Sequence, residues 1–300
     1  MLINYQTCVS TQKVALVPYA AHHVPKYHEW MKDPDIQEAT ASEPLTLEEE
    51  YAMQRSWRKH GNKLTFVICR PFELEIPAHG KENSDRNDVA AHSISIDNSE
   101  VYGKDEIDAM IGDVNLFVSD SADDESDPDD ANGPSPEEDT AKYVVVIGEL
   151  ELMIAEPAHQ GRGYGRAALL LFLDYIVRNE RAILEEFHRY TTHDAAPQGQ
   201  FKSAAEPSLT QFPLQFDHFS AKIGSANQRS LRLFEGLGFR KESETPSYFG
   251  EFELRLDRER LMALVGSGGK EGAYQVQTYR CACDSDGGSR DAGQAMKDGQ

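Results

Sequence analysis

The sequence predicts an α/β fold in which a central mixed sheet is flanked by helices. Strand-like and helix-like segments follow one another in the order β, α, α, β, β, β, α, β, α, β. Adjacent strand segments predict hairpins in the first part, and helices between strands predict crossovers in the second. A glycine-rich turn, QGRGYG, joins one strand to the most apolar helix. These features together favour an α+β mixed sheet.

The first part of the chain supplies the helices that precede the main sheet. A strand is expected at 13–20, a short helix at 22–32, a helix from Thr46 to about Gly61, and a strand at 63–70. The third of these has the clearest start, because Thr46 followed by Glu49 fits a capping box. The last, KLTFVICR, reads as a buried strand because it is almost continuously apolar.

The second part begins with two strands that would form a hairpin. Strands are expected at 111–119 and 143–155, a helix at 165–180, a strand at 214–224, a helix at 225–239 and a strand at 247–256. The sequence between the first two strands is acidic and of low complexity. A long insertion at a hairpin tip costs little, because the entropy of loop closure grows slowly with length.

We expect one domain over residues 1–260, interrupted by low-order insertions. The insertions are 73–108, 120–140 and 181–214, and a Gly/Ser/Asp-rich tail over 261–300 is expected to be disordered. Residues 120–139 hold ten acids and no bases. Such a segment cannot bury enough apolar surface to offset the entropy lost on ordering.

Composition excludes several classes of partner. The net charge of −21 is concentrated in the first two insertions, and it argues against nucleic-acid or membrane binding, which require basic surface. Four cysteines in 300 residues do not form a disulfide framework. Cys281 and Cys283 lack a second pair at zinc spacing, so no metal is expected. Without a signal-peptide or membrane-spanning pattern, the expected location is cytoplasmic.

The glycine-rich turn predicts an anion site. Unpaired N–H groups at a helix N-terminus, with glycines that let the backbone approach closely, suit a phosphate or pyrophosphate. Arg162 and Arg166 add positive charge. Three interpretations compete: a dinucleotide fingerprint, Gly163-x-Gly165-x-x-Ala168; a connector without a ligand; and the pyrophosphate of coenzyme A. The dinucleotide interpretation lacks the expected second strand ending in an acid.

Two motifs favour coenzyme A. Gln160-x-x-Gly163-x-Gly165 resembles the acyl-CoA signature of the GNAT acetyltransferase superfamily. Downstream, AKIGSANQRSLRLFEGLGF resembles the second element of that superfamily. The stretches VPYAAHHVPKYHEWM, TASEPLTLEEEYAMQRSW, IGDVNLFV and GELELMIAEP resemble the eukaryotic N-acetyltransferase 9 branch, which is assigned to tubulin N-termini.

The resemblance implies a sheet splayed at the coenzyme A site and acetyl-CoA as co-substrate. The strand LMIA would bind the pantetheine through its backbone, and the turn would hold the pyrophosphate. The implied cofactor-binding residues are Met153, Ile154, Ala155, Gln160, Gly161, Arg162, Gly163, Tyr164, Gly165, Arg166, Asn227, Ser230 and Phe234.

Acetyl transfer to an amine needs a base and a proton donor for the leaving thiolate. Glu149 and Glu151 lie two residues apart on one strand and therefore share a face. Either could accept the proton, Glu151 being nearer the splay, or both could simply form a polar strand face. The superfamily usually places a tyrosine where this chain has Phe234, which cannot donate. Ser230, one helical turn earlier, resembles a serine that some acetyltransferases present to the coenzyme A thiol. The alternative is that Ser230 is an ordinary hydroxyl on the helix surface.

The predicted function is acetyl-CoA-dependent N-acetyl transfer in a ternary complex. The resemblance implies a protein N-terminus as the acceptor, with tubulin as the candidate. Two alternatives stay open: a module that binds acetyl-CoA and microtubules without catalysis, and a small-molecule amine acetyltransferase.

Overall fold

The structure of the chain is a computed structural model that describes residues 1–71, 104–120, 145–194, 213, 215–267 and 274–279. In this part of the chain, nine strands form one sheet in the order β7-β8-β6-β5-β4-β3-β2-β1-β9. The strands are β1 (Thr7–Ser10), β2 (Ala15–Pro18), β3 (Lys63–Cys69), β4 (Met110–Asp120), β5 (Val146–Ile154), β6 (His218–Gly224), β7 (Arg240–Lys241), β8 (Glu251–Asp257) and β9 (Gln275–Thr278). Only β5 and β6 pair in parallel; the other neighbours are antiparallel. The predicted mixed sheet is confirmed.

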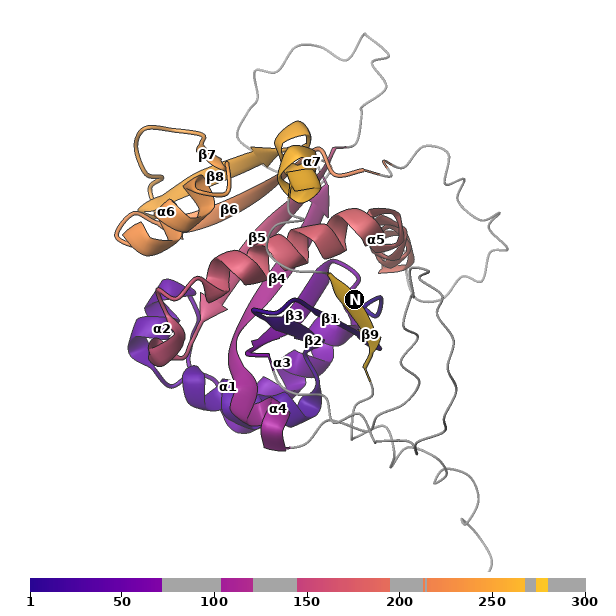
Figure 1. The fold of residues 1–300 in the computed structure, drawn as a ribbon, viewed down its shortest axis with the longest axis vertical. Coiled ribbons are helices and arrows are strands. Elements are labelled where there is room, and N and C mark those ends of the chain that lie inside the picture. Colours follow the sequence, from indigo (N-terminus) through magenta and orange to yellow (C-terminus); the bar gives the residue numbers. More distant parts are fainter. Residues whose placement is uncertain (72–103, 121–144, 195–212, 214, 268–273, 280–300) are drawn as a thin grey trace, which may run out of the picture.

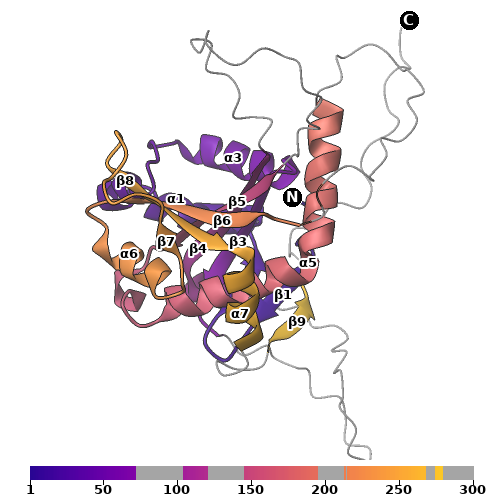
Figure 2. The ribbon, with the colours of Figure 1, turned by 90° about the horizontal axis from the view of Figure 1, so that it is seen from above.

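Helices cover both faces of this sheet (Figures 1 and 2). They are α1 (Val24–Trp30), α2 (Pro34–Ala39), α3 (Leu47–Lys59), α4 (Lys104–Ala109), α5 (Tyr164–Asp194), α6 (Gln228–Glu235) and α7 (Arg258–Ser267), with short 3-10 turns at Ala21–His23 and Pro157–His159. Figure 2 shows α1 and α3 on one side of the sheet and α6 and α7 on the other. The helix α5 packs on the same side as α6, so the two sides are named the α1 face and the α5 face.

Alternation along the strands gives each face its own core. In β3, Leu64, Phe66 and Ile68 belong to the cluster on the α5 face, whereas Val67 and Cys69 belong to the cluster on the α1 face. This is the two-residue period of a strand buried on both sides. On the α5 face, the ring of Phe172 packs edge-on against Phe66 with centroids 5.9 Å apart. The sheet is therefore a buried middle layer, and polar groups on it need partners.

The helix α3 begins as the sequence predicts. Thr46 Oγ1 accepts a hydrogen bond from Glu49 N at 3.3 Å, and Glu49 Oε2 accepts from Thr46 N at 2.8 Å, so the capping box is confirmed. The helix docks through buried Gln54, whose Nε2 donates to Tyr19 O at 2.9 Å. The predicted hairpin of β4 and β5 is also confirmed, with pairing from Gly112 opposite Ile154 to Asp120 opposite Val146.

Several boundaries differ from the sequence-based expectation. The helix α5 runs on through residues 181–194, which were assigned to a low-order insertion, because Ile183, Leu184 and Phe187 continue its buried stripe. Residues 104–109 form α4 inside the expected insertion 73–108. In the expected disordered tail, α7 extends to Ser267 and β9 pairs with β1. These elements are stabilised by contacts with distant segments, so the local sequence gives little sign of them. The rest of each insertion lies outside the described residues.

Candidate active site

The parallel pair β5 and β6 separates part-way along its length. Pairing covers Ile147 with His218, Gly148 with Phe219 and Glu149 with Ser220, and it ends there. Beyond this rung, β5 stays paired with β4 as far as Ile154, while β6 stays paired with β8 as far as Gly224. Among the described residues, the edge of β5 that faces β6 therefore lacks a strand partner from Leu150 onward (Figure 1). An extended ligand with amide groups can occupy such an edge as a strand would.

The glycine turn follows directly at the end of this open edge. Gly161 and Gly163 have φ of +68° and +82°, a conformation that residues with a Cβ rarely adopt. An added Cβ at either position would meet no atom within 4 Å, so their surroundings are open. Among the described residues, no backbone oxygen accepts from the amides of residues 161–165. Because α5 begins at Tyr164, these N–H groups and the positive end of the helix dipole lie together.

Gly165 has a different reason for being glycine. A Cβ there would lie 3.1 Å from Leu152 Cδ2 and 3.3 Å from Leu233 Cδ2. The start of α5 is therefore packed closely against both β5 and α6. This contact brings the open edge, the turn and α6 into one place.

Side chains around the turn fix its shape. Gln160 Nε2 donates to Ile154 O at 2.9 Å, and Arg229 Nη1 donates to Gln160 Oε1 at 2.9 Å. Arg166 Nη1 donates to Gly236 O at 3.2 Å, which ties α5 to the end of α6. Arg162 is exposed, and Tyr164 is half-buried with Lys13 Nζ 5.1 Å from its ring centroid. Of the two arginines singled out in the sequence, Arg162 faces solvent and Arg166 contributes to packing of the helices.

The helix α6 carries the remaining predicted ligand-binding residues. Asn227 is its N-cap, and its Oδ1 accepts from Ser230 N at 3.1 Å. Ser230 is half-buried one turn into the helix. Phe234 is 3 % exposed and packs edge-on against Phe239 at 5.0 Å, within the core of the α5 face. Phe234 thus has the surroundings of a core residue.

Glu149 and Glu151 lie on the α1 face at the point of separation. Glu149 occupies the last paired rung, and its Oε2 accepts from Lys222 Nζ at 2.9 Å. Glu151 lies two residues further, on the part of β5 that has left β6, and its side chain reaches solvent. The protein around its carboxyl nevertheless removes hydration. This burial, with the negative charges of Asp113 and Glu149, raises the pKa of Glu151 to about 7.

A buried polar network lies beside Glu151 that the sequence analysis missed. Asp113 is 2 % exposed, and its Oδ2 accepts from Tyr27 Oη at 3.2 Å and from Asn115 Nδ2 at 3.0 Å. Asn115 lies directly opposite Glu151 in the sheet, and its Oδ1 accepts from Thr65 Oγ1 at 2.7 Å. The alternation Asp-x-Asn on an otherwise apolar strand was the signal that could have found it.

Lys63 is a cation close to these carboxyl groups. Its Nζ lies 3.8 Å from the ring centroid of Trp57 and 4.1 Å from that of Phe117. Burial lowers the pKa of Lys63 to about 8, although the charges of Glu151 and Asp113 act in the opposite direction. Burial also raises the pKa of Asp113 to about 6, so the α1 face combines aromatic walls with two carboxyl groups, Asp113 and Glu151, whose protonation changes near neutral pH.

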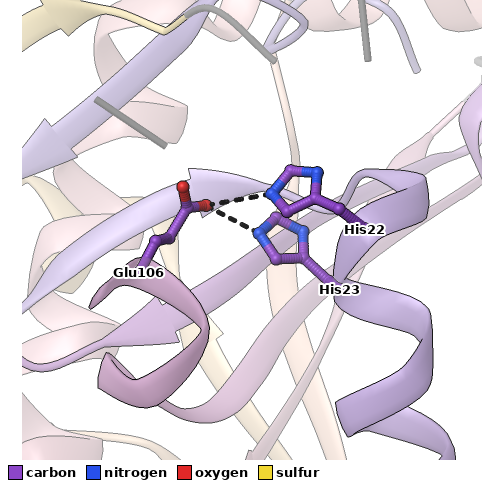
Figure 3. Close-up of side chains that lie close together, drawn as sticks. All are labelled: His22, His23 and Glu106. Carbon is purple, nitrogen blue, oxygen red and sulfur yellow. Dashed lines mark hydrogen bonds and ion pairs between the residues drawn. The ribbon is translucent and has the colours of Figure 1, made fainter. Parts of the chain in front are cut away.

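A second polar cluster lies at the N-terminal end of α1 and has the residue types of a metal site (Figure 3). One oxygen of Glu106 lies 2.7 Å from His23 Nε2 and 3.5 Å from His22 Nε2, and Tyr279 Oη donates to it at 2.9 Å. Ala20 N donates to His23 Nδ1 at 2.9 Å. His23 must then carry its proton on Nε2, the atom that would bind a metal. The cluster fits a hydrogen-bonded carboxylate and does not fit a cation.

No helix in the described residues is both long and apolar enough to cross a bilayer.

Comparison with known proteins places these features in a family. The model of the acetyltransferase (GNAT) domain matches residues 13–240. An N-acetyltransferase 9-like protein of Schizosaccharomyces pombe is 35% identical over 86% of this chain and 99% of its own length. The human alpha/beta-tubulin-N-acetyltransferase 9 is 34% identical over 85% of this chain and 86% of its own. The solved structure of Vibrio cholerae spermidine N-acetyltransferase with CoA and spermine aligns with 83% of this chain and 98% of that one, at 13% identity and a TM-score of 0.44.

Proposed function

The chain belongs to the GNAT acetyltransferase family and is an N-acetyltransferase that resembles the N-acetyltransferase 9 proteins, and we propose that its acceptor is the α-amine of a protein N-terminus. Tubulin is the first acceptor to test, because the human relative carries it in its name. The observation that carries the proposal is the separation of β5 from β6 at Glu149, followed by a turn whose amides, at residues 161–165, donate to no backbone oxygen in the described part of the chain. Free cysteines at Cys8 and Cys69 support a cytoplasmic location.

The cofactor side of the proposed site is built mainly from backbone. The edge of β5 from Leu152 to Ala155, which faces no strand among the described residues, would bind the pantetheine, and the amides from Gly161 to Gly165 would bind the pyrophosphate. When bound, acetyl-CoA supplies the acetyl group as a thioester. Asn227 caps the start of α6, and Ser230 lies three residues before Leu233, the residue of α6 that is close to Gly165.

The chemistry is assigned to two side chains. The acceptor nitrogen attacks the thioester carbon, the C–S bond breaks, and Glu151 takes the proton that the nitrogen loses. Glu149 is less available, because it is paired with Lys222. Ser230 is the proposed proton donor to the leaving sulfur, since Phe234 has no donor and is buried. A base with a pKa near 7 suits an α-amine, which is partly neutral at that pH.

The test uses labelled acetyl-CoA with N-terminal peptides of tubulin, unrelated N-terminal peptides and polyamines. Acetylation of the peptide α-amine supports the proposal, and tandem mass spectrometry locates the label. Turnover of polyamines alone would reassign the enzyme to small amines. Stabilisation by acetyl-CoA without turnover of any acceptor would favour a binding module. Phe234, at the position where the superfamily usually has a tyrosine, is the residue that favours this alternative.

A further inference from the structure

The buried carboxyl group of Asp113 has no role in the chemistry assigned so far. It lies on the α1 face of β4, where Asp113 pairs with Met153 and Asn115 pairs with Glu151. Asp113 is therefore the diagonal neighbour of Glu151 on one face of the sheet, a position within reach of electrostatic interaction. Burying a carboxylate costs free energy unless it is hydrogen-bonded, so the hydrogen-bond partners of Asp113 determine whether it can be ionised.

Two side chains donate hydrogen bonds to this carboxyl, and a third fixes the orientation of one of them. Tyr27 Oη and Asn115 Nδ2 both donate to Oδ2. The orientation of Asn115 is fixed, because its Oδ1 accepts from Thr65 Oγ1 and the opposite orientation would turn that oxygen toward Asp113. Donors from α1 and β4 therefore favour the ionised form of a group that burial alone would neutralise.

We propose that Asp113, held by Tyr27 and Asn115, is a positioning residue that keeps the base Glu151 strong enough to take a proton from the acceptor amine. The inference rests on the function proposed above. A negative charge diagonal to Glu151 disfavours a second negative charge, so Glu151 holds a proton more firmly than an isolated carboxylate would. The strength of a general base rises with its affinity for the proton, and catalysis is best when that affinity matches the working pH.

The other charges near the pair divide between both signs. Glu149 on β5 adds to the effect of Asp113 on Glu151, while Lys63 on β3 and Lys222 on β6 oppose it. Lys222 is already paired with Glu149, so these two largely cancel. Lys63 faces both Asp113 and Glu151. Asp113 is thus the nearby acid whose charge no salt bridge among the described residues offsets.

The experiment measures the titration of Glu151 directly and then the pH profile. Selective ¹³C labelling of glutamate carboxyls, with Glu151→Gln to assign the signal, follows Glu151 in the cofactor-free protein. In Asp113→Asn, whose amide can still accept from Tyr27, the midpoint should fall by about one pH unit. The acid limb of kcat/KM on the acetylated peptide should move with it, and the plateau should decrease. Glu253→Gln, which removes an exposed acid on β8, should move neither.

Tyr27→Phe provides a second variant if Asp113→Asn folds poorly. It removes one donor, so Asp113 ionises at higher pH and the midpoint of Glu151 should shift downward by a smaller amount. An unchanged Glu151 midpoint in both variants would overturn the inference, whatever the activity. A loss of activity at all pH values without movement of the acid limb would do the same, because it marks a structural role. If wild-type protein acetylates no acceptor while the titration shifts, the proposed function fails and the catalytic role of Asp113 falls with it.

Discussion

The two faces of the sheet are held together in different ways. The α5 face is apolar: the long helix α5 packs Phe172 and its neighbours on the strands, and the proposed pyrophosphate site at its start consists of backbone amides. The α1 face buries polar groups instead, among them Asp113, Asn115, His23 and Glu106. Each of these has a hydrogen-bond partner from another element, although the second oxygen of Glu106, Oε2, is buried without one among the described residues.

This difference separates recognition by the backbone from chemistry that depends on side chains. A turn of amides needs glycine and a helix, and it binds any diphosphate in the same manner. Buried side-chain networks depend on specific pairs, and they set protonation and shape near the acceptor. We therefore expect substitutions on the α5 face to change cofactor affinity or stability, and those on the α1 face to change rate and pH dependence.

The largest effect is expected for Glu151→Gln. The amide keeps the shape of the side chain but cannot accept the proton, so kcat/KM should fall by roughly 10²- to 10⁴-fold, with little change in the Kd of acetyl-CoA. Steady-state kinetics at saturating acetyl-CoA measures the first quantity and calorimetry the second. Glu149→Gln is the matched variant on the same strand.

The pair of variants distinguishes the two carboxylates. Since Glu149 is held by Lys222, its loss should reduce the rate much less than the loss of Glu151. Equal losses would mean that the base is shared, and a larger loss in Glu149→Gln would exchange their roles.

The next effect is a loss of stability in acid on the α1 face. Burial lowers the pKa of His23 to about 4, below the value of 6.5 for an exposed histidine, although the hydrogen bond to Glu106 acts in the opposite direction. The unfolded chain therefore binds a proton that the folded chain does not. The free energy of unfolding should fall by about 3 kcal/mol as the pH falls from 6.5 toward 4. Urea unfolding across this range measures it.

Two variants assign that loss to the ring of His23. His23→Asn can keep an acceptor for Ala20 N without a titrating ring, so its curve should be flatter over the same range. His22→Gln, at the half-buried neighbour, should retain the decline. A decline that persists in His23→Asn would move the acid sensitivity to another group.

Much of the α5 face could be predicted because its features are local in sequence. The glycines at 161, 163 and 165, the strand before them and the apolar stripe after them are contiguous. The same holds for Asn227 as the N-cap of α6 and for the capping box at Thr46. Local hydrogen bonds and side-chain period determine these elements, so the pattern is readable without the fold.

The α1 face could not be predicted because its contacts join distant residues. Tyr27 meets Asp113 across 86 positions, and Tyr279 meets Glu106 across 173. Glu106 lies in a segment whose composition favours disorder, and β9 becomes a strand only by pairing with β1. Sequence spacing alone gives no register between such segments. The shared strand face of Glu149 and Glu151 could be predicted because strand alternation is local. Their neighbours on β4 and β6 could not, because those strands are distant in sequence.

A smaller effect is expected for Gly163→Val on the α5 face. The positive φ makes valine strained, and its side chain would extend into the open space where the pyrophosphate is proposed to lie. The Kd of acetyl-CoA should rise by at least about tenfold, which corresponds to 1.4 kcal/mol. Calorimetry measures the affinity, and circular dichroism checks the fold.

Gly250→Val controls for backbone strain. Gly250 has a φ of +78° and open surroundings, but it lies in the turn before β8. Its variant should lose similar stability while binding acetyl-CoA normally. Unchanged affinity in Gly163→Val would remove the pyrophosphate from this turn and leave the open edge of β5 without its neighbouring site.

The smallest effect is expected for deletion of residues 121–139, and its sign is informative. The hairpin of β4 and β5 is paired up to Asp120 and Val146, so the ends to be joined are already neighbours. Removing these residues shortens the connection about fourfold, and the entropy of loop closure for such a change in length corresponds to roughly 1 kcal/mol. The deletion should therefore raise the free energy of unfolding slightly and leave kcat/KM unchanged, as urea unfolding and the peptide assay would measure. A loss of activity with intact stability would instead make the acidic segment part of acceptor recognition. Acceptor binding would then depend on this segment as well as on the side chains of the α1 face.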